Sequence, residues 1–372
     1  MTGQKYGAGG TAALVVAHCA GMLDLTALPV WVGALVERFG FSPQQAGGIV
    51  TLFLLGAVAA SLFVAPRLNR INQKLAATAG YGVAALAFFA ASTKSGLAEL
   101  AALHLVAGLA VGTGLSMVHG AIGKSANPHR LFALAGIAIG LLGIVLLGVL
   151  PQLLIAFGRE ALFQVFGLFM AIACLFCAVL FVNPDRGEVH ASAPFGRAIW
   201  FTVFGISVMT FNQAMVFSFV EVIGKLRGFP AEGVLGVLIA LGIVNFLVPS
   251  PLAAILQRRL VAETVVQIGP AVQAFFAVIV TSATVFALWA PVAAFFVAIQ
   301  IFTHTFAFGL LARLDRTGRA VAATPAMLMI GAALGPIVGG ALGQNFGFGA
   351  LGAAGVAVAI LSIVFFTKAR SA

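Results

Sequence analysis

Apolar blocks of about twenty residues recur along the chain, separated by short breaks that hold charged residues, proline or glycine. Because the hydrocarbon core of a bilayer is about 30 Å thick, roughly 20 apolar residues are enough for one membrane-spanning helix. The pattern predicts twelve such helices, with limits at 11–35, 44–65, 75–93, 97–119, 131–156, 161–182, 198–222, 232–253, 262–284, 287–311, 321–343 and 347–367. The break between the ninth and tenth segments, within "SATVFALWAP", is the weakest, because it holds no charge.

The composition agrees with this pattern, since 62% of the 372 residues are hydrophobic and only 8% are charged. Such values are typical of a polytopic membrane protein. We therefore predict an all-α integral membrane protein embedded in a lipid bilayer. The opening "MTGQKYGAGG" is too short for a cleavable signal, so the first apolar block is expected to remain as a helix.

The net charge of +10 is distributed unevenly over the predicted loops. If both termini are cytoplasmic, fifteen Lys and Arg residues lie inside, and only Arg38, Lys94, Arg159, Lys225 and Arg227 lie outside. This asymmetry obeys the positive-inside rule. It indicates a cell-membrane protein with both termini in the cytoplasm, and it explains the positive charge without a nucleic-acid partner.

The two halves of the chain resemble each other at an offset of 188 to 189 positions. Gly40, Phe41 and Gly48 recur as Gly228, Phe229 and Gly236, and the arginines Arg70 and Arg130 recur as Arg259 and Arg319. The repeat predicts two six-helix bundles, residues 1–182 and 198–372, joined by a cytoplasmic linker at 183–197. Such an architecture places a site between the halves, which can open to either side of the membrane.

Polar side chains within the predicted spans gather on the first, fourth, seventh and tenth helices. We expect these helices to line a central pathway, because intramembrane polar groups are costly and usually functional. Asn245 and Gln273 lie on other helices and are exceptions. The expected substrate-binding residues are His18, Trp31, Phe211, Asn212, Gln213, Gln300 and His304.

Asp24 lies in "HCAGMLDLTALPVW" with no Lys or Arg within ten residues on either side. An ionised aspartate at the bilayer centre costs about 2.5–3.5 kcal/mol, so the position favours proton exchange. His104 is expected at a similar depth, and histidine titrates near neutral pH. We predict that Asp24 and His104 form a proton-coupling pair, direct or water-bridged. The alternative is that Asp24 is a buried structural acid and that His104 only bridges helices.

Two further patterns indicate packing. Cys174 and Cys177 form "CLFC" inside an apolar segment, which favours helix packing over redox or metal chemistry. Gly331, Gly335, Gly339 and Gly343 repeat every four residues, and Gly136 and Gly140 share this spacing in the fifth segment. Glycine at this spacing permits close approach of a neighbouring helix.

The chain resembles the major facilitator superfamily over its full length. The resemblance implies two six-helix bundles around a central cavity with alternating access. The family's basic loop reads Gly, three residues, Asp-Arg, any residue, Gly-Arg-Lys, and "APRLNRINQK" at 65–74 retains only Arg70 and Lys74 of it. By this resemblance, the cytoplasmic gate loops hold Arg67, Arg70, Lys74, Arg258 and Arg259.

The family's helix four often carries an arginine linked to proton transfer, and His104 stands at that place. Antiporters of the family often bear "GPxxGG" in helix five, whereas this chain has "GPIVGG" only in helix eleven. An acid in helix one resembles what multidrug antiporters use, and Asp24 occupies that position.

The sequence predicts a monomeric secondary transporter without cofactors that moves a small organic solute and exchanges protons. No Lys or Arg lies deep in a span, which favours a neutral, amphipathic or cationic solute, and export is favoured over uptake. The alternatives are an uptake symporter and a transition-metal exporter that uses His18, Cys19 and Asp24 with His104 or His304. An intramembrane enzyme is a third alternative, but no catalytic motif supports it.

Overall fold

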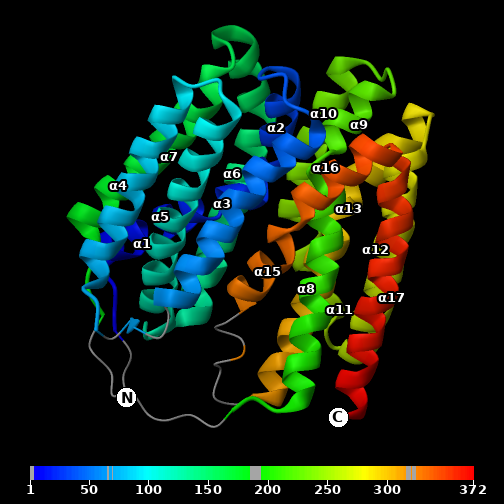
Figure 1. Ribbon diagram of the computed structural model, residues 1–372. Helices are drawn as coiled ribbons and strands as arrows, with labels where there is room; N and C mark the ends of the chain where they lie inside the picture. Colours follow the sequence, from blue (N-terminus) through cyan, green and yellow to red (C-terminus); the bar gives the residue numbers. More distant parts are fainter. Residues whose placement is uncertain (1–3, 65–66, 69, 185–193, 316–319, 321–323) are drawn as a thin grey trace. The chain divides into compact units, whose positions relative to one another are not determined.

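The computed structural model describes residues 4–64, 67–68, 70–184, 194–315, 320 and 324–372. These residues form the helices α1 (Ala8–Gly21), α2 (Leu23–Glu37), α3 (Pro43–Val64), α4 (Gln73–Ser92), α5 (Leu97–Gly123), α6 (Pro128–Phe157), α7 (Glu160–Leu180), α8 (Arg197–Phe217), α9 (Val220–Leu226), α10 (Ala231–Leu247), α11 (Pro249–Leu256), α12 (Ala262–Ser282), α13 (Phe286–Leu314), α15 (Thr324–Ala333), α16 (Gly335–Phe346) and α17 (Gly349–Ser371) (Figure 1).

Within the described residues, twelve helical segments are long and apolar enough to cross a membrane. Their limits agree with the predicted spans to within a few residues at most ends. The weakest predicted break is present, since α12 ends at Ser282 and α13 begins at Phe286. The prediction of an all-α protein with twelve membrane-spanning segments is confirmed.

Four of these segments consist of two helices each, namely α1 with α2, α8 with α9, α10 with α11, and α15 with α16. Pro249 and Pro336 stand in the first turns of α11 and α16, where a missing backbone N–H is tolerated. Near the break between α8 and α9, the Ser218 hydroxyl donates to the Ala214 carbonyl, a local bond that competes with the helix ladder.

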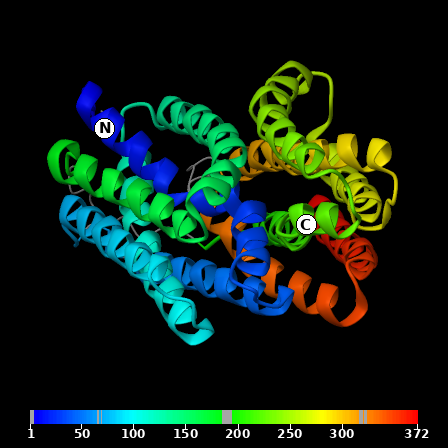
Figure 2. The ribbon, with the colours of Figure 1, turned by 90° about the horizontal axis from the view of Figure 1, so that it is seen from above.

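Unit 1 comprises Met1–Ala27 and Leu52–Ser192. In this unit α1 packs against α5, α6 and α7, and α4 packs against α5 and α7. Figure 2 shows α7 (green) between α1 (dark blue) and α4 (cyan). An aromatic cluster fills the space between α4, α5 and α7, with Phe88, Phe163 and Phe166 all buried.

Unit 2 comprises Leu28–Thr51 and Ala193–Ala372. Here α8 packs against α12, α13, α15, α16 and α17, while α10 and α11 pack against α13. The ends of α2 and α3 belong to this unit: Lys225 Nζ lies 2.7 Å from carboxylate oxygens of both Glu37 and Glu221. A Cβ on Gly47 would fall 2.1 Å from the Pro336 carbonyl oxygen, so α3 and α16 meet at backbone distance.

The internal repeat is visible in the backbone. Gly40 has a φ of 74° and Gly228, its predicted counterpart, has a φ of 73°. The other described glycines with positive φ are Gly158 and Gly347, which stand 189 positions apart, at φ 81° and 79°. Glycine adopts this conformation at little cost, so the same turn recurs at equivalent places in the two halves. Arg319, the predicted counterpart of Arg130, lies outside the described residues.

The glycine face of α15 and α16 packs against α8, as the four-residue spacing predicted. A Cβ on Gly331 would fall 2.1 Å from the Ser207 carbonyl oxygen, and one on Gly339 would fall 2.5 Å from the Met215 carbonyl oxygen. Gly136 does not share this role, because a Cβ there would meet nothing within 4 Å. Spacing alone does not distinguish a glycine that faces a helix from one at an open surface.

Candidate functional site

The first membrane-spanning segment is interrupted beside Asp24. Helix α1 ends at Gly21, and Met22 caps it with its backbone N–H donated to the His18 carbonyl. Helix α2 then begins at Leu23, so Asp24 stands in its first turn with only 2% of its surface exposed. His18 and Asp24 therefore lie on opposite sides of this break, on two different helices.

His18 forms a pair that the sequence analysis did not predict. Its Nδ1 lies 3.0 Å from Nε2 of His119 on α5, and the two ring centroids are 5.2 Å apart. At this distance the two imidazoles share a hydrogen bond, in which one ring nitrogen donates its N–H and the other accepts. Both histidines lie in apolar segments, which was the signal available in the sequence; only the packing of α1 against α5 shows that they meet.

His104 lies in the aromatic cluster of unit 1. Its Nδ1 is 2.6 Å from the Leu100 carbonyl oxygen, and its ring meets the edges or faces of Phe163 and Phe88 at centroid distances of 5.1 and 5.9 Å. These contacts come from α4, α5 and α7 and bury the imidazole completely. The expected pairing of His104 with Asp24 stays a prediction.

Unit 2 contains a chain of buried amide hydrogen bonds. Asn212 Nδ2 donates to Gln273 Oε1 (3.1 Å), and Gln273 Nε2 donates to Gln300 Oε1 (3.0 Å). Gln300 Nε2 then donates to Thr210 Oγ1 (2.8 Å), whose hydroxyl donates to the Ile206 carbonyl. The chain links α8, α12 and α13. Gln273, an apparent exception in the sequence, is the residue that joins the two expected site residues Asn212 and Gln300.

The remaining expected substrate-binding residues lie on several helices of unit 2. Trp31 on α2 is fully buried, Gln213 on α8 is buried, and Phe211 is half-buried. His304 on α13 is half-buried, and its ring stacks on Phe308 at 4.8 Å. Gln300, one turn before His304, is held in the amide chain instead.

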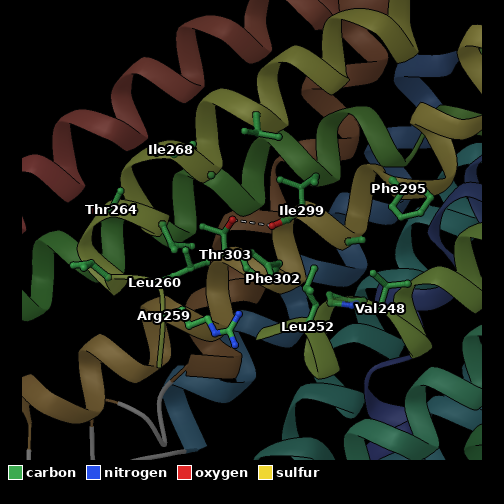
Figure 3. A pocket seen from close by; sticks show the side chains of 16 residues that line it. Val248, Leu252, Arg259, Leu260, Thr264, Ile268, Phe295, Ile299, Phe302 and Thr303 are labelled. Atoms are coloured by element: carbon green, nitrogen blue, oxygen red, sulfur yellow. Dashed lines mark hydrogen bonds between the residues drawn. The ribbon is translucent and has the colours of Figure 1, made fainter. Parts of the chain in front are cut away.

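The expected gate residues lie near helix ends. The Arg67 guanidinium donates to the Phe63 carbonyl and stands over the Phe63 ring. Lys74 donates its backbone N–H to Asn183 Oδ1 (2.7 Å), and Arg70 and Arg258 are exposed. Arg259 lines an apolar cavity formed by α10–α13 (Figure 3). Ala65 and Asn69, two departures from the family's basic loop, lie outside the described residues.

The sequence profile described as the Major Facilitator Superfamily matches residues 14–314, well over half of the chain. The chain belongs to the Major Facilitator Superfamily. It is therefore a membrane transporter of small solutes and not an enzyme. A search of the curated proteins finds no match.

Solved structures of superfamily transporters share this fold. A bacterial homolog of the human lysosomal transporter Spinster, in an inward-facing and occupied conformation, aligns with a TM-score of 0.73 at 14% identity, over 97% of this chain and 96% of its own. A mutant of the nucleoside transporter NupG aligns with a TM-score of 0.72 at 13% identity, over 97% and 99% of the two chains. At these identities the likeness concerns the fold alone.

Proposed function

We propose that this superfamily member is a proton-coupled transporter that exports a small neutral, amphipathic or cationic organic solute by alternating access. The observation that supports the proposal most directly is the position of Asp24. Its carboxyl group is buried, and it stands beside an interruption of the first membrane-spanning segment. Interrupted helices are the usual place for substrate and coupling-ion sites in secondary transporters.

Proton exchange explains why a carboxylate is retained at this point. An ionisable group inside a membrane-spanning segment is costly and usually functional, and the exchange of a proton in each transport cycle is a function that needs a carboxyl group. His104 is the second group that we propose for proton coupling. Its imidazole is buried among phenylalanine rings, and one ring nitrogen bonds the Leu100 carbonyl.

The predicted solute class follows from the charge of the spans. No Lys or Arg lies deep in a predicted span, and an organic anion would normally need such a cation. The polar groups proposed for solute contact are neutral amides and histidines, including Gln213 and His304. Uptake of a small metabolite with protons is the alternative direction.

The structure gives less support to a transition-metal exporter. Among the described residues, no group of three or more His, Cys, Asp or Glu side chains is placed to hold a metal ion. His18 is instead engaged with His119.

The test is the variant Asp24→Asn, which keeps the size of the side chain and removes its titratable group. A thermal-shift screen of the purified protein against metabolites, dyes and antibiotics first identifies a transported solute. In proteoliposomes, solute flux driven by a pH gradient should fall at least tenfold in the variant, while folded yield and solute counterflow persist.

Glu99→Gln is the matched control, because Glu99 is an exposed carboxylate within a candidate span and pairs with Lys94 at 2.8 Å. Its pH-driven flux should equal that of the unmodified protein. Unchanged pH-driven flux in Asp24→Asn would remove this carboxyl group from the mechanism.

A further inference from the structure

A cavity of about 540 Å³ lies in unit 2 between the α10–α11 junction, α12 and α13 (Figure 3). Its volume is within the range of small-molecule sites, about 300–1,000 Å³. The walls are almost entirely apolar, with Leu252, Ile268, Phe295, Ile299 and Phe302 among the lining side chains. The cavity contains none of the residues proposed for proton coupling or solute binding.

Helices α12 and α13 come close together at two residues that line the cavity, Gly269 and Thr303. A Cβ on Gly269 would fall 2.2 Å from Thr303 Oγ1, so glycine is needed for the helices to meet there. The Thr303 hydroxyl donates to the Ile299 carbonyl at 2.8 Å, as Figure 3 shows, which satisfies its hydrogen bond within α13. The Thr303 hydroxyl therefore offers little to a polar ligand.

The cavity rim is exposed and apolar. Ile268 is 55% exposed, Leu252 is 42% exposed and Phe295 is 41% exposed. All three belong to candidate membrane spans. Exposed apolar side chains on a membrane-spanning helix contact lipid hydrocarbon, so an acyl chain is the natural occupant of this space.

One end of the cavity carries a positive charge. Arg259 lines the cavity, and within the described part of the chain its guanidinium makes no ion pair. The nearby acid Glu263 is engaged with Arg313, with 3.2 Å between Nη2 and Oε1. The positive-inside rule places this loop at the cytoplasmic surface, where anionic headgroups gather.

We propose that this cavity is a binding site for one anionic phospholipid of the surrounding bilayer. An acyl chain occupies the apolar space between α12 and α13, and the headgroup phosphate pairs with Arg259. The cavity shares Arg259 with the expected gate loop but holds none of the residues proposed for proton coupling or solute contact, and the proposal does not depend on proton coupling.

The experiment titrates the full chain, purified in detergent, with phosphatidylglycerol and with phosphatidylcholine of the same acyl chains, and counts bound lipids by native mass spectrometry. The unmodified protein should prefer phosphatidylglycerol about fivefold, the factor that corresponds to ~1 kcal/mol for one arginine near an anionic lipid. Arg259→Gln should abolish the preference. Arg258→Gln, which removes the neighbouring exposed cation outside the cavity, should keep it.

A second variant tests the acyl-chain part of the site. Val272 lines the cavity and is half-buried. The larger side chain of Val272→Phe should therefore reduce the free volume of the cavity and weaken the binding of both phosphatidylglycerol and phosphatidylcholine. Thermal midpoints establish that each variant is folded. The proposal would be overturned in favour of a diffuse surface charge if Arg258→Gln lost the preference for phosphatidylglycerol as fully as Arg259→Gln. Unchanged lipid binding in Val272→Phe would overturn it in the same way. Displacement of phosphatidylglycerol by millimolar glycerol phosphate would overturn it in favour of a soluble anion.

Discussion

At the scale of single residues, the polar side chains of the spans differ in how completely their neighbours engage them. His104 bonds the Leu100 carbonyl and touches phenylalanine rings, His18 meets His119, and Asn212 and Gln300 join through Gln273. A buried amide with both groups bonded rigidifies its surroundings. The same residue types can therefore act in helix packing or in transport chemistry, and single substitutions distinguish the two roles.

His104→Asn separates these roles, because asparagine places an amide nitrogen near the position of Nδ1 and cannot titrate. We expect the bond to the Leu100 carbonyl and the folded yield to persist, while flux driven by a pH gradient falls at least tenfold. The measurement is the proteoliposome assay used for Asp24→Asn. Full pH-driven flux in His104→Asn would assign His104 to packing alone.

Gln273→Leu should destabilise unit 2. The substitution leaves the Asn212 amide and the Gln300 carbonyl oxygen without their bonds in a buried site, at a cost of about 1–3 kcal/mol. The thermal midpoint in detergent should fall by several degrees. Gln267→Leu on the same helix is the control, because Gln267 makes only a 3.4 Å bond to Thr367 near the surface. Equal midpoints for the two variants would show that the amide chain adds no stability.

At the scale of helices, the repeated glycines of α15 and α16 permit backbone contact with α8. A helix pair held in this way excludes even a methyl group, since the nearest atoms to a Cβ on Gly331 are backbone atoms of Ser207 and cannot rotate away. The four-residue spacing thus places glycines along the face of α15 and α16 that contacts the backbone of α8.

Gly331→Ala should therefore cost ~1–3 kcal/mol, as overpacking of a tight contact usually does. Gly136→Ala on α6 should leave stability unchanged or slightly raised, because open space surrounds that position and alanine favours helices. Thermal midpoints of the two variants in detergent provide the comparison. The interpretation fails if Gly331→Ala is as stable as Gly136→Ala.

At the scale of the whole molecule, the division into units does not follow the order of the chain. Residues 28–51 come from the first half, yet they cluster with residues 193–372. The contacts that hold them include the ion pairs of Lys225 with Glu37 and Glu221, and the backbone approach of Gly47 to Pro336. The division into two six-helix bundles at 1–182 and 198–372, which the repeat predicts, stays a prediction.

The distribution of charge predicts the orientation of the molecule in the membrane. Both termini should be cytoplasmic, because that arrangement places fifteen of the basic residues inside. A fluorescent protein fused after Ala372 should therefore fluoresce in a bacterial host, and alkaline phosphatase at the same point should be inactive. Fusions inserted after Gly40 should show the opposite pattern. An active phosphatase at Ala372 would reverse the orientation.

The sequence by itself determined the number and helical type of the membrane-spanning segments and their limits to within a few residues, because hydrophobic runs and the breaks between them are local properties of a chain in a bilayer. It also identified the repeat, which reappears in the paired turns at Gly40 and Gly228 and at Gly158 and Gly347. Composition and hydrophobic pattern were enough to predict a polytopic membrane protein; the repeat, the polar residues in the spans and the family resemblance added the prediction of a transporter, and the family match agrees.

Only the tertiary structure decided which polar groups meet. His119 and Gln273 were not predicted as members of any site, because a side chain's partner depends on how helices distant in sequence rotate and pack. The break at Met22, which the hydrophobic pattern did not predict, likewise places His18 and Asp24 on two different helices. The cavity beside Arg259 is lined by residues of α11, α12 and α13, and no local pattern in the sequence predicts that these residues come together.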